Sequence, residues 1–302
     1  MSETTRTSAP PHEVTPAELA ALHGLSVSGA RPSLPEYVGQ LWGRRHFIVA
    51  FSQAKLMAQY SQAKLGQLWQ VATPLLNAFV YFLIFGVVMG GRDNMANDEY
   101  IPFLVTGIFV FTFTQASVIS GVKSISGNLG LVRALHFPRA SLPISFSLQQ
   151  LQQLLYSMLV LAVVMIGFQH FPDLAWVLVI PALALQLVFN TGLAMIFARM
   201  GSNIPDLAQL MPFILRTWMY GSGVIFPLRY KLEGHGPDWL IHVVEANPAT
   251  VYIDLMRYAL MDGAYADGIP QITWVYAVGW AVVIGVGGFV YFWKAEEQYG
   301  RG

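Results

Sequence analysis

Polar side chains inside otherwise apolar stretches are the residues of this 302-residue chain that could act on a ligand. Arg216 falls near the middle of the apolar segment 207–226. A charge at the centre of a bilayer costs at least ~2.5–3.5 kcal/mol on insertion scales, so this side chain must face protein, water or an anionic ligand. The sequence leaves a structural partner and a role in substrate binding equally open.

Four glutamines, at positions 149, 150, 152 and 153, stand early in another apolar stretch. Gln149, Gln153 and Tyr156 are separated by four and three residues, which places them on one face of a helix. Hydrogen bonding between helices is one interpretation, because polar side chains commonly join membrane-spanning helices. The alternative is a polar entrance that accepts the hydroxyl groups of a substrate.

Aromatic side chains gather in the outer halves of three apolar segments. Interfacial belts explain some of them, but they do not readily explain residues as deep as Phe79, Phe113 and Trp218. Because aromatic faces stack on the C–H edges of sugar rings, a carbohydrate pathway is the competing interpretation. The predicted pathway residues are Phe79, Phe82, Phe85, Phe113, Gln149, Gln153, Arg216, Trp218 and Tyr220.

The sequence contains no Walker A phosphate-binding loop, no nucleophile elbow and no His-Glu-x-x-His pattern. The seven histidines lie outside the predicted spans, and the chain has no cysteine, which excludes thiolate metal sites and disulfides. Basic and acidic residues balance at 17 each, which argues against nucleic-acid binding. We therefore expect no catalytic residue and no metal site. A membrane enzyme of lipid-linked sugar metabolism and a non-transporting scaffold are the weaker alternatives.

Composition indicates an integral membrane protein. Hydrophobic residues make up 55% of the chain and charged residues 11%, with a mean hydropathy of +0.50, whereas soluble domains carry about 25% charged residues. We predict an all-α fold with six transmembrane helices, because six segments approach the ~20 residues that a span requires. These segments are 68–89, 100–121, 142–167, 176–198, 207–226 and 274–293.

The distribution of lysine and arginine predicts the orientation. With the N-terminus inside, the cytoplasmic segments hold twelve of these residues and the external segments four, which is a positive-inside bias. Both termini are therefore predicted to be cytoplasmic. The external region 227–273 is too polar to span, but it contains two apolar pieces separated by Asn247-Pro248.

Residues 36–60, ahead of the first span, have the periodicity of one amphipathic helix. Val38, Leu41, Trp42, Ile48, Val49 and Leu56 are predicted to share its apolar side. A basic helix that carries tryptophan beside a span is typical of the membrane interface, so we expect Trp42, Arg44, Arg45 and Lys55 to contact membrane lipids.

Domain boundaries follow from composition. Residues 1–35 are rich in Ser, Thr, Pro and Ala and are predicted to be a disordered cytoplasmic arm. The interface helix and its lead-in occupy 36–66, a transmembrane domain occupies 67–294, and a cytoplasmic tail occupies 295–302.

A short basic island, residues 123–139, lies between the second and third predicted spans on the cytoplasmic side. It predicts a helix of about two turns, with Asn128 as the N-cap and Pro138 as the stop. A helix this short is marginal in water, because nucleation is costly. We therefore expect it to dock against a partner.

The order of these elements resembles the permease subunit of ABC-2 type exporters, particularly those for lipid-linked polysaccharides, O antigens and teichoic acids. The resemblance covers about residues 36–294, and His136-Phe-Pro-Arg139 and Val224-Ile-Phe-Pro227 are among the segments that carry it. Ser222-Gly223 departs from the Ser-Pro that the family often has at this point. The N-terminal arm and residues 62–69 look similar to actinobacterial galactan exporters.

The resemblance implies that the basic island is a coupling helix. It would contact a nucleotide-binding subunit through Asn128, Leu131, Arg133, His136, Phe137 and Arg139. The family assembles as a homodimer with two such subunits, so ATP and magnesium would bind the partner and no cofactor would bind this chain. It also implies a re-entrant helical hairpin between the fifth and sixth spans, a lipid-linked glycan as substrate and a place in the bacterial cytoplasmic membrane. Export of a teichoic acid, a glycolipid or a drug by the same fold is the alternative.

Overall fold

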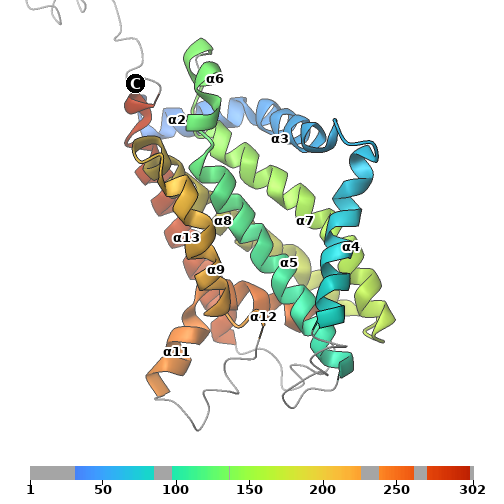
Figure 1. The fold of residues 1–302 in the computed structure, drawn as a ribbon. Coiled ribbons are helices and arrows are strands. Elements are labelled where there is room, and N and C mark those ends of the chain that lie inside the picture. Colours follow the sequence, from blue (N-terminus) through green and yellow to red (C-terminus); the bar gives the residue numbers. More distant parts are fainter. Residues whose placement is uncertain (1–30, 85–96, 136, 226–237, 262–270, 300–302) are drawn as a thin grey trace, which may run out of the picture.

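The computed structural model describes residues 31–84, 97–135, 137–225, 238–261 and 271–299, and all regular elements within these ranges are helices (Figure 1). Short 3-10 turns occur at Gly66–Leu68, Ser126–Asn128, Leu174–Leu178 and Glu296–Gln298. The predicted all-α class is confirmed for this part of the chain. The α-helices are α2 (Leu34–Gly43), α3 (Arg45–Tyr60), α4 (Trp69–Tyr81), α5 (Asn97–Val122), α6 (Leu129–Ala134), α7 (Ser141–Gly167), α8 (Val179–Asn203), α9 (Leu207–Tyr220), α11 (Asp238–Ala246), α12 (Pro248–Leu260) and α13 (Gln271–Trp293).

Four helical segments in the described ranges are long and apolar enough to cross a membrane, and they match the second, third, fourth and sixth predicted spans. They are Glu99–Val122, Ser141–Gly167, Leu174–Asn203 and Gln271–Trp293. The first predicted span appears as the shorter apolar segment Trp69–Ile84, and its remaining residues lie outside the described ranges.

The fifth predicted span, 207–226, is not one continuous helix. Helix α9 has 14 residues and is therefore about 21 Å long, which is short of the ~30 Å hydrocarbon core. It ends at Tyr220, and the chain then turns through residues 221–225. A hydrophobicity window does not detect this end, because the turn residues are themselves small or apolar.

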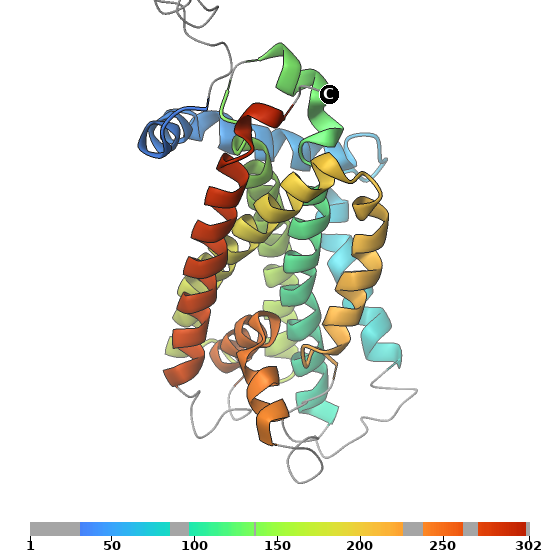
Figure 2. The ribbon, with the colours of Figure 1, turned by 90° about the vertical axis from the view of Figure 1, so that its left-hand side faces the viewer.

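Helix α5 lies at the centre of the bundle, with α4, α7, α8 and α9 around it (Figures 1 and 2). The most apolar window of α5 is 72% buried, compared with 22% for the corresponding windows of α7 and α13. Leu104, Val105 and Val110 are fully buried. A helix enclosed on all sides has no polar face, which accounts for its nearly continuous apolar sequence.

Helices α8 and α13 touch through their backbones at two glycines. A Cβ atom added to Gly192 would overlap the backbone of Ile284, and one added to Gly288 would overlap the backbone of Gly192. Small residues let spanning helices approach this closely and gain van der Waals contact along their length. The glycines therefore fix where α8 and α13 cross.

The bundle has two distinct ends (Figures 1 and 2). Helices α2, α3 and α6 and the C-terminal segment lie at one end, and α11 and α12 lie at the other. The first and last described segments meet at the same end, because the Arg31 backbone N–H donates to Glu297 Oε1 at 2.8 Å. The predicted orientation requires this placement of the interface helix, the basic island and the two termini.

The predicted interface helix is two helices rather than one. Helices α2 and α3 are separated at Arg44 and lie across the end of the bundle (Figure 1). The predicted apolar side is partly wrong: Val38, Trp42 and Val49 are exposed, with Trp42 at 72%. The break at Arg44 separates the two helices, so one continuous face does not run through both. The buried residues are Tyr37, Leu41, Ile48, Ser52 and Leu56.

The boundary of the predicted disordered arm also differs, because α2 begins at Leu34, within residues 1–35. Arg31, assigned to the disordered arm, places its guanidinium over the Trp293 ring at 4.2 Å, and Trp293 Nε1 donates to the Pro32 carbonyl at 3.1 Å. In the predicted tail, Glu296 and Tyr299 are buried. Contacts between the two ends of the chain order these residues, and composition does not reveal such contacts.

Candidate functional site

Helix α6 stands at the end of the bundle and is largely exposed (Figure 1). It has six residues, slightly fewer than predicted, and it ends at Ala134, ahead of Pro138. Val132 is buried in the cluster that holds Ile48 and Leu142, while Leu131 is partly buried and Leu135 is 52% exposed. The helix thus rests on the bundle through Val132 and Leu131 and presents most of its surface outward.

Asn128 stands at the N-cap position of α6, but its side chain caps no backbone N–H, so the predicted cap is wrong. The preceding 3-10 turn directs Asn128 Nδ2 back to the Ser124 carbonyl at 2.8 Å. Asn128 Oδ1 instead accepts from Lys55 Nζ of α3 at 3.3 Å. This hydrogen bond ties α3 to the start of α6. The Lys55 ammonium also lies 5.2 Å from the centre of the Phe51 ring on its own helix.

Beyond α6, Phe137 and Arg139 attach the chain to the scaffold, while His136 lies outside the described residues. The Phe137 ring is 5.6 Å from the Phe47 ring of α3. The Arg139 backbone N–H donates to Glu296 Oε1 at 2.9 Å, and the Arg139 guanidinium donates to the Glu296 carbonyl.

Burial raises the pKa of the Glu296 carboxyl, against the opposing effect of the hydrogen bonds from Arg139 and Tyr37 and of the Arg139 charge. Burial also raises the pKa of Tyr37, as does the neighbouring Glu296. The Tyr37 hydroxyl therefore remains protonated and acts as a donor to the carboxylate. Burial likewise raises the pKa of Tyr299, close to the same group.

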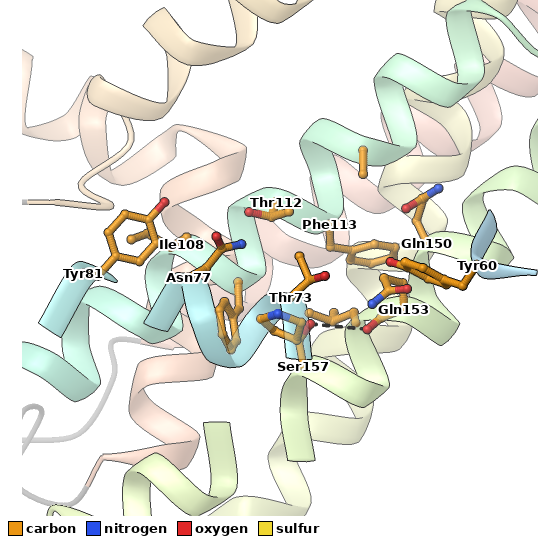
Figure 3. Close-up of a pocket in the computed structure, with 14 residues that line it drawn as sticks. Tyr60, Thr73, Asn77, Tyr81, Ile108, Thr112, Phe113, Gln150, Gln153 and Ser157 are labelled. Carbon is orange, nitrogen blue, oxygen red and sulfur yellow. Dashed lines mark hydrogen bonds between the residues drawn. The ribbon is translucent and has the colours of Figure 1, made fainter. Parts of the chain in front are cut away.

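A pocket with both apolar and uncharged polar side chains in its wall lies between α4, α5 and α7 (Figure 3). It encloses a cavity of about 160 Å³, and none of the described residues that line it is charged. Gln153 and Phe113, two predicted pathway residues, both line it. Amide and hydroxyl groups in an apolar bundle provide hydrogen-bond donors and acceptors without charge. The polar lining consists of Tyr60, Thr73, Asn77, Tyr81, Thr112, Gln150, Gln153 and Ser157.

The glutamines of α7 also join helices. Gln149 Nε2 donates to Gln59 Oε1 at 3.4 Å, Gln152 Nε2 donates to Ser52 Oγ at 3.2 Å, and Gln153 Nε2 donates to the Gln70 carbonyl at 3.1 Å. Interhelical hydrogen bonding therefore accounts for all three. Only Gln153 combines this role with a place in the pocket, and its Oε1 is buried without a hydrogen-bond partner.

The other predicted pathway residues do not converge on that pocket. Phe79 is exposed on α4 and Phe82 on the π-helical residues that continue it to Ile84, and Arg216 and Tyr220 are exposed on α9. Phe85 lies outside the described residues. In a single chain, Gln153 and Phe113 therefore line the pocket, whereas Phe79, Phe82, Arg216 and Tyr220 lie on two exposed helix faces.

Trp218 contacts the helix pair α11–α12 instead of an open path. Its Nε1 donates to Asn247 Oδ1 at 3.0 Å, and its ring meets the Phe111 ring edge-on at 5.7 Å. Asn247 also caps α12 by accepting from the Ala249 N–H at 3.2 Å, and its Nδ2 donates to the Gly221 carbonyl at 3.1 Å. The Asn-Pro pair thus joins the end of α9 to the start of α12.

Arg257 of α12 is a buried cation, although from sequence it was only one of the four Lys and Arg residues predicted to be external. Its guanidinium donates to the carbonyls of Phe103, Gly223 and Val224 at 3.0–3.2 Å. The side chain is 2% exposed, and only Glu296 joins it as a buried Lys, Arg, Asp or Glu among the described residues. Its burial could have been predicted from its position within the apolar run 249–261.

No group of three or more His, Cys, Asp or Glu side chains that could hold a metal ion occurs in the part of the chain that the structure describes. The arrangement offers three features: an exposed short helix at one end, an uncharged polar pocket within the bundle, and a pair of short helices pinned by Asn247 and Arg257 at the other end.

Comparison with known proteins gives an independent result. The model of the ABC-2 type transporter family matches residues 47–261. The chain is 26% identical over 253 residues to the O-antigen export system permease protein RfbA of Klebsiella pneumoniae, covering 83% of this chain and 93% of that protein. It is 29% identical over 191 residues to RfbA of Myxococcus xanthus, covering 63% and 72%. The polysialic acid transport protein KpsM of Escherichia coli is 22% identical over 218 residues, covering 71% and 81%.

Proposed function

This chain belongs to the ABC-2 type transporter family, and on that basis we propose that it is the permease of an ATP-driven exporter that carries a lipid-linked polysaccharide across the bacterial cytoplasmic membrane. The relatives named as export permeases for O antigen and as polysialic acid transport proteins support the polysaccharide class of substrate. ATP and magnesium bind a separate nucleotide-binding subunit in this proposal, with two copies per transporter.

The observation that carries the proposal is the exposed helix α6 at the end of the bundle. A helix of six residues has little stability of its own, so its outward surface is best explained by a docked partner. Lys55 at its start and Arg139 beyond its end connect it to the bundle. Force applied to α6 by a partner would therefore reach the spanning helices.

A second copy of the chain would complete the pathway. Arg216 is exposed on α9, beside apolar residues such as Phe213, which is 75% exposed. An arginine that faced lipid at membrane depth would be costly, whereas one that faces water or a second protomer is tolerated. In the homodimer the exposed faces of α4 and α9 therefore face the partner and the path between the two copies, and bring Phe79, Phe82 and Tyr220 to that path.

The chemistry of the pocket fits an uncharged, hydroxyl-rich ligand. Its amides and hydroxyls can exchange hydrogen bonds with sugar hydroxyls, and the Phe113 ring at its wall offers a face to a sugar C–H edge. Weak contacts at several sites allow a polymer to enter and to leave. Export of a teichoic acid, a glycolipid or a drug is the alternative, and a comparison of ATPase stimulation by each class distinguishes them.

The test of coupling is to reconstitute the chain with its nucleotide-binding subunit and to replace Arg133 and Phe137 with alanine. We expect ATP hydrolysis to lose its dependence on transport. The matched control is Phe171→Ala, because Phe171 is exposed and follows α7 at the end of the bundle opposite α6. Normal coupling in an assembled transporter with both α6 substitutions would contradict the proposal.

The test of the pathway is Gln153→Leu together with Phe82→Ala. We expect each variant to reduce polymer export while assembly with the nucleotide-binding subunit persists. Wild-type export by both variants would contradict the assigned path. Leu159→Ala is the control, because Leu159 is 64% exposed on the same helix as Gln153 and does not line the pocket.

A further inference from the structure

A buried carboxylate joins three segments of the chain at the end of the bundle that carries α6. Glu296 follows α13 and is 6% exposed. Its Oε2 accepts from the Tyr37 hydroxyl at 2.7 Å, and its Oε1 accepts from the Arg139 backbone N–H at 2.9 Å. A buried carboxylate is costly unless its oxygens are hydrogen-bonded. Any movement of Tyr37 or Arg139 away from Glu296 would therefore be unfavourable, which holds α2, the chain ahead of α7 and the end of α13 together.

Tyr37 extends the same network by one residue. Its hydroxyl donates to Glu296 and accepts from the Ala140 backbone N–H at 3.1 Å. The consecutive N–H groups of Arg139 and Ala140, immediately ahead of α7, are thus bound by side chains from the C-terminal segment and from α2. No side chain of α7 itself caps this helix, since its N-cap residue is Ala140.

These contacts lie on the chain that leaves α6. The Lys55–Asn128 hydrogen bond holds the entry to α6 against α3, and the Glu296–Arg139 pair holds its exit against α2, α7 and the end of α13. A displacement of α6 therefore reaches α7 through Arg139. Glu296 couples this movement directly to the end of α13 and, through Tyr37, strengthens the link to α2 that the Ala140 N–H already makes.

We propose that Glu296 is a positioning residue for coupling: it makes α2, α7 and the end of α13 move as one body when the partner subunit displaces α6. This rests on the proposed function, since it requires an ATPase that docks on α6. Replacement by glutamine keeps the shape but removes the negative charge: the amide oxygen accepts from one of the two donors, and the amide nitrogen faces the other. Charge-assisted hydrogen bonds are thereby replaced by weaker neutral ones.

The experiment compares Glu296→Gln with Glu297→Gln in the reconstituted transporter. Glu297 is the matched control, because it is the adjacent glutamate, is exposed, and accepts from the Arg31 backbone N–H. We expect Glu296→Gln to reduce polymer exported per ATP hydrolysed by about three- to tenfold, as the replacement of charge-assisted hydrogen bonds by neutral ones implies. The KM for ATP should stay within twofold of the wild-type value, because the nucleotide site is on the partner. Glu296→Asp, which keeps both acceptors, should restore part of the ratio.

Hydrogen exchange supplies a second measurement that needs no transport. The N–H groups of Arg139 and Ala140 are direct reporters, because they donate to Glu296 and Tyr37. Glu296→Gln should accelerate exchange at Arg139 and Tyr37→Phe at Ala140, whereas Glu297→Gln should change neither.

An unchanged export-to-ATP ratio together with unchanged exchange in Glu296→Gln would overturn the proposal. Faster exchange with an unchanged ratio would overturn it too, since Glu296 would then be structural only. If the wild-type chain recruits no ATPase, the proposed function fails first, and that outcome is distinguishable from a failure of Glu296 alone.

Discussion

Replacement of Arg257 by methionine is predicted to be among the most damaging single substitutions outside the glycine contacts. The guanidinium donates four hydrogen bonds to three carbonyls, those of Phe103, Gly223 and Val224. Methionine fills part of the space but donates nothing, so each buried carbonyl loses a charged donor. Asp254, whose carboxylate lies 3.6 Å from the guanidinium, is 30% exposed and can regain water.

The expected loss of stability comes from the three carbonyls that lose their donor rather than from the ion pair with Asp254. A buried group left unsatisfied costs about 1–3 kcal/mol, and disruption of a buried charge network typically costs about 3–5 kcal/mol in total, because the individual terms are not additive. We expect Arg257→Met to lower the free energy of unfolding by about 3–5 kcal/mol. Arg257→Lys should fall between this variant and the wild type, because a single ammonium cannot reach all three carbonyls as the planar guanidinium does.

The assay is unfolding of the purified protein in detergent, followed by tryptophan fluorescence, with Arg44→Met as the control. Arg44 is exposed at the break between α2 and α3, so its substitution should cost little. A loss of less than about 1 kcal/mol for Arg257→Met, within the range of an exposed pair, would refute the reasoning. It would mean that these carbonyls find water or other donors without Arg257.

Three further predictions follow from the packing and the buried groups. Gly192→Val should prevent the close approach of α8 and α13 and lower the melting temperature strongly, whereas Gly279→Val, where a Cβ meets no atom within 4 Å, should be tolerated. Asn247→Ala removes the cap of α12 and the acceptor for Trp218, so it should cost about 1–3 kcal/mol and shift the tryptophan emission spectrum. Burial raises the pKa of Glu296 above its usual value near 4.5, so the folded protein binds more protons than the unfolded one above that pH. The free energy of unfolding should therefore fall as the pH rises from about 4.5 to the raised pKa, and Glu296→Gln should flatten this slope.

Periodicity and hydrophobic length predicted most helices, because these signals are local. The predicted apolar segments 100–121, 142–167 and 274–293 lie within α5, α7 and α13. Backbone polar groups in an apolar environment must be satisfied within helices or closed barrels, and continuous apolar segments of about 20 residues indicate helices. The break at Arg44 and the early end of α9 were missed, because they depend on what each helix packs against.

The roles of charged residues were harder to predict, because they depend on partners distant in sequence. Arg216 was singled out as the charge within a span, yet it is exposed in the single chain, while Arg257 is the buried cation. Arg257 contacts Phe103, more than 150 positions away, and Glu296 contacts Arg139 at a similar separation. Helical spacing gives no information about such pairs. Asn128 shows the same limit, since a side chain suited to capping was directed to Ser124 and Lys55 instead.

The placement of charge is consistent with a transport path. In the described part of the chain, the two buried charges lie at opposite ends of the bundle, Arg257 in the α12 region and Glu296 beside α6. Each is held by backbone groups from distant segments, which suits rigid junctions because such networks fail when one partner moves. The pocket between α4, α5 and α7 has only neutral polar groups. A charge there would bind an ionic ligand tightly and slow its release, whereas amides and hydroxyls of similar strength can be exchanged one after another along a glycan.

Introducing a carboxylate into the pocket by Thr73→Glu should therefore block export without loss of assembly with the ATPase subunit, while Thr73→Ser should preserve export. Full export by Thr73→Glu would show that the glycan does not pass this pocket.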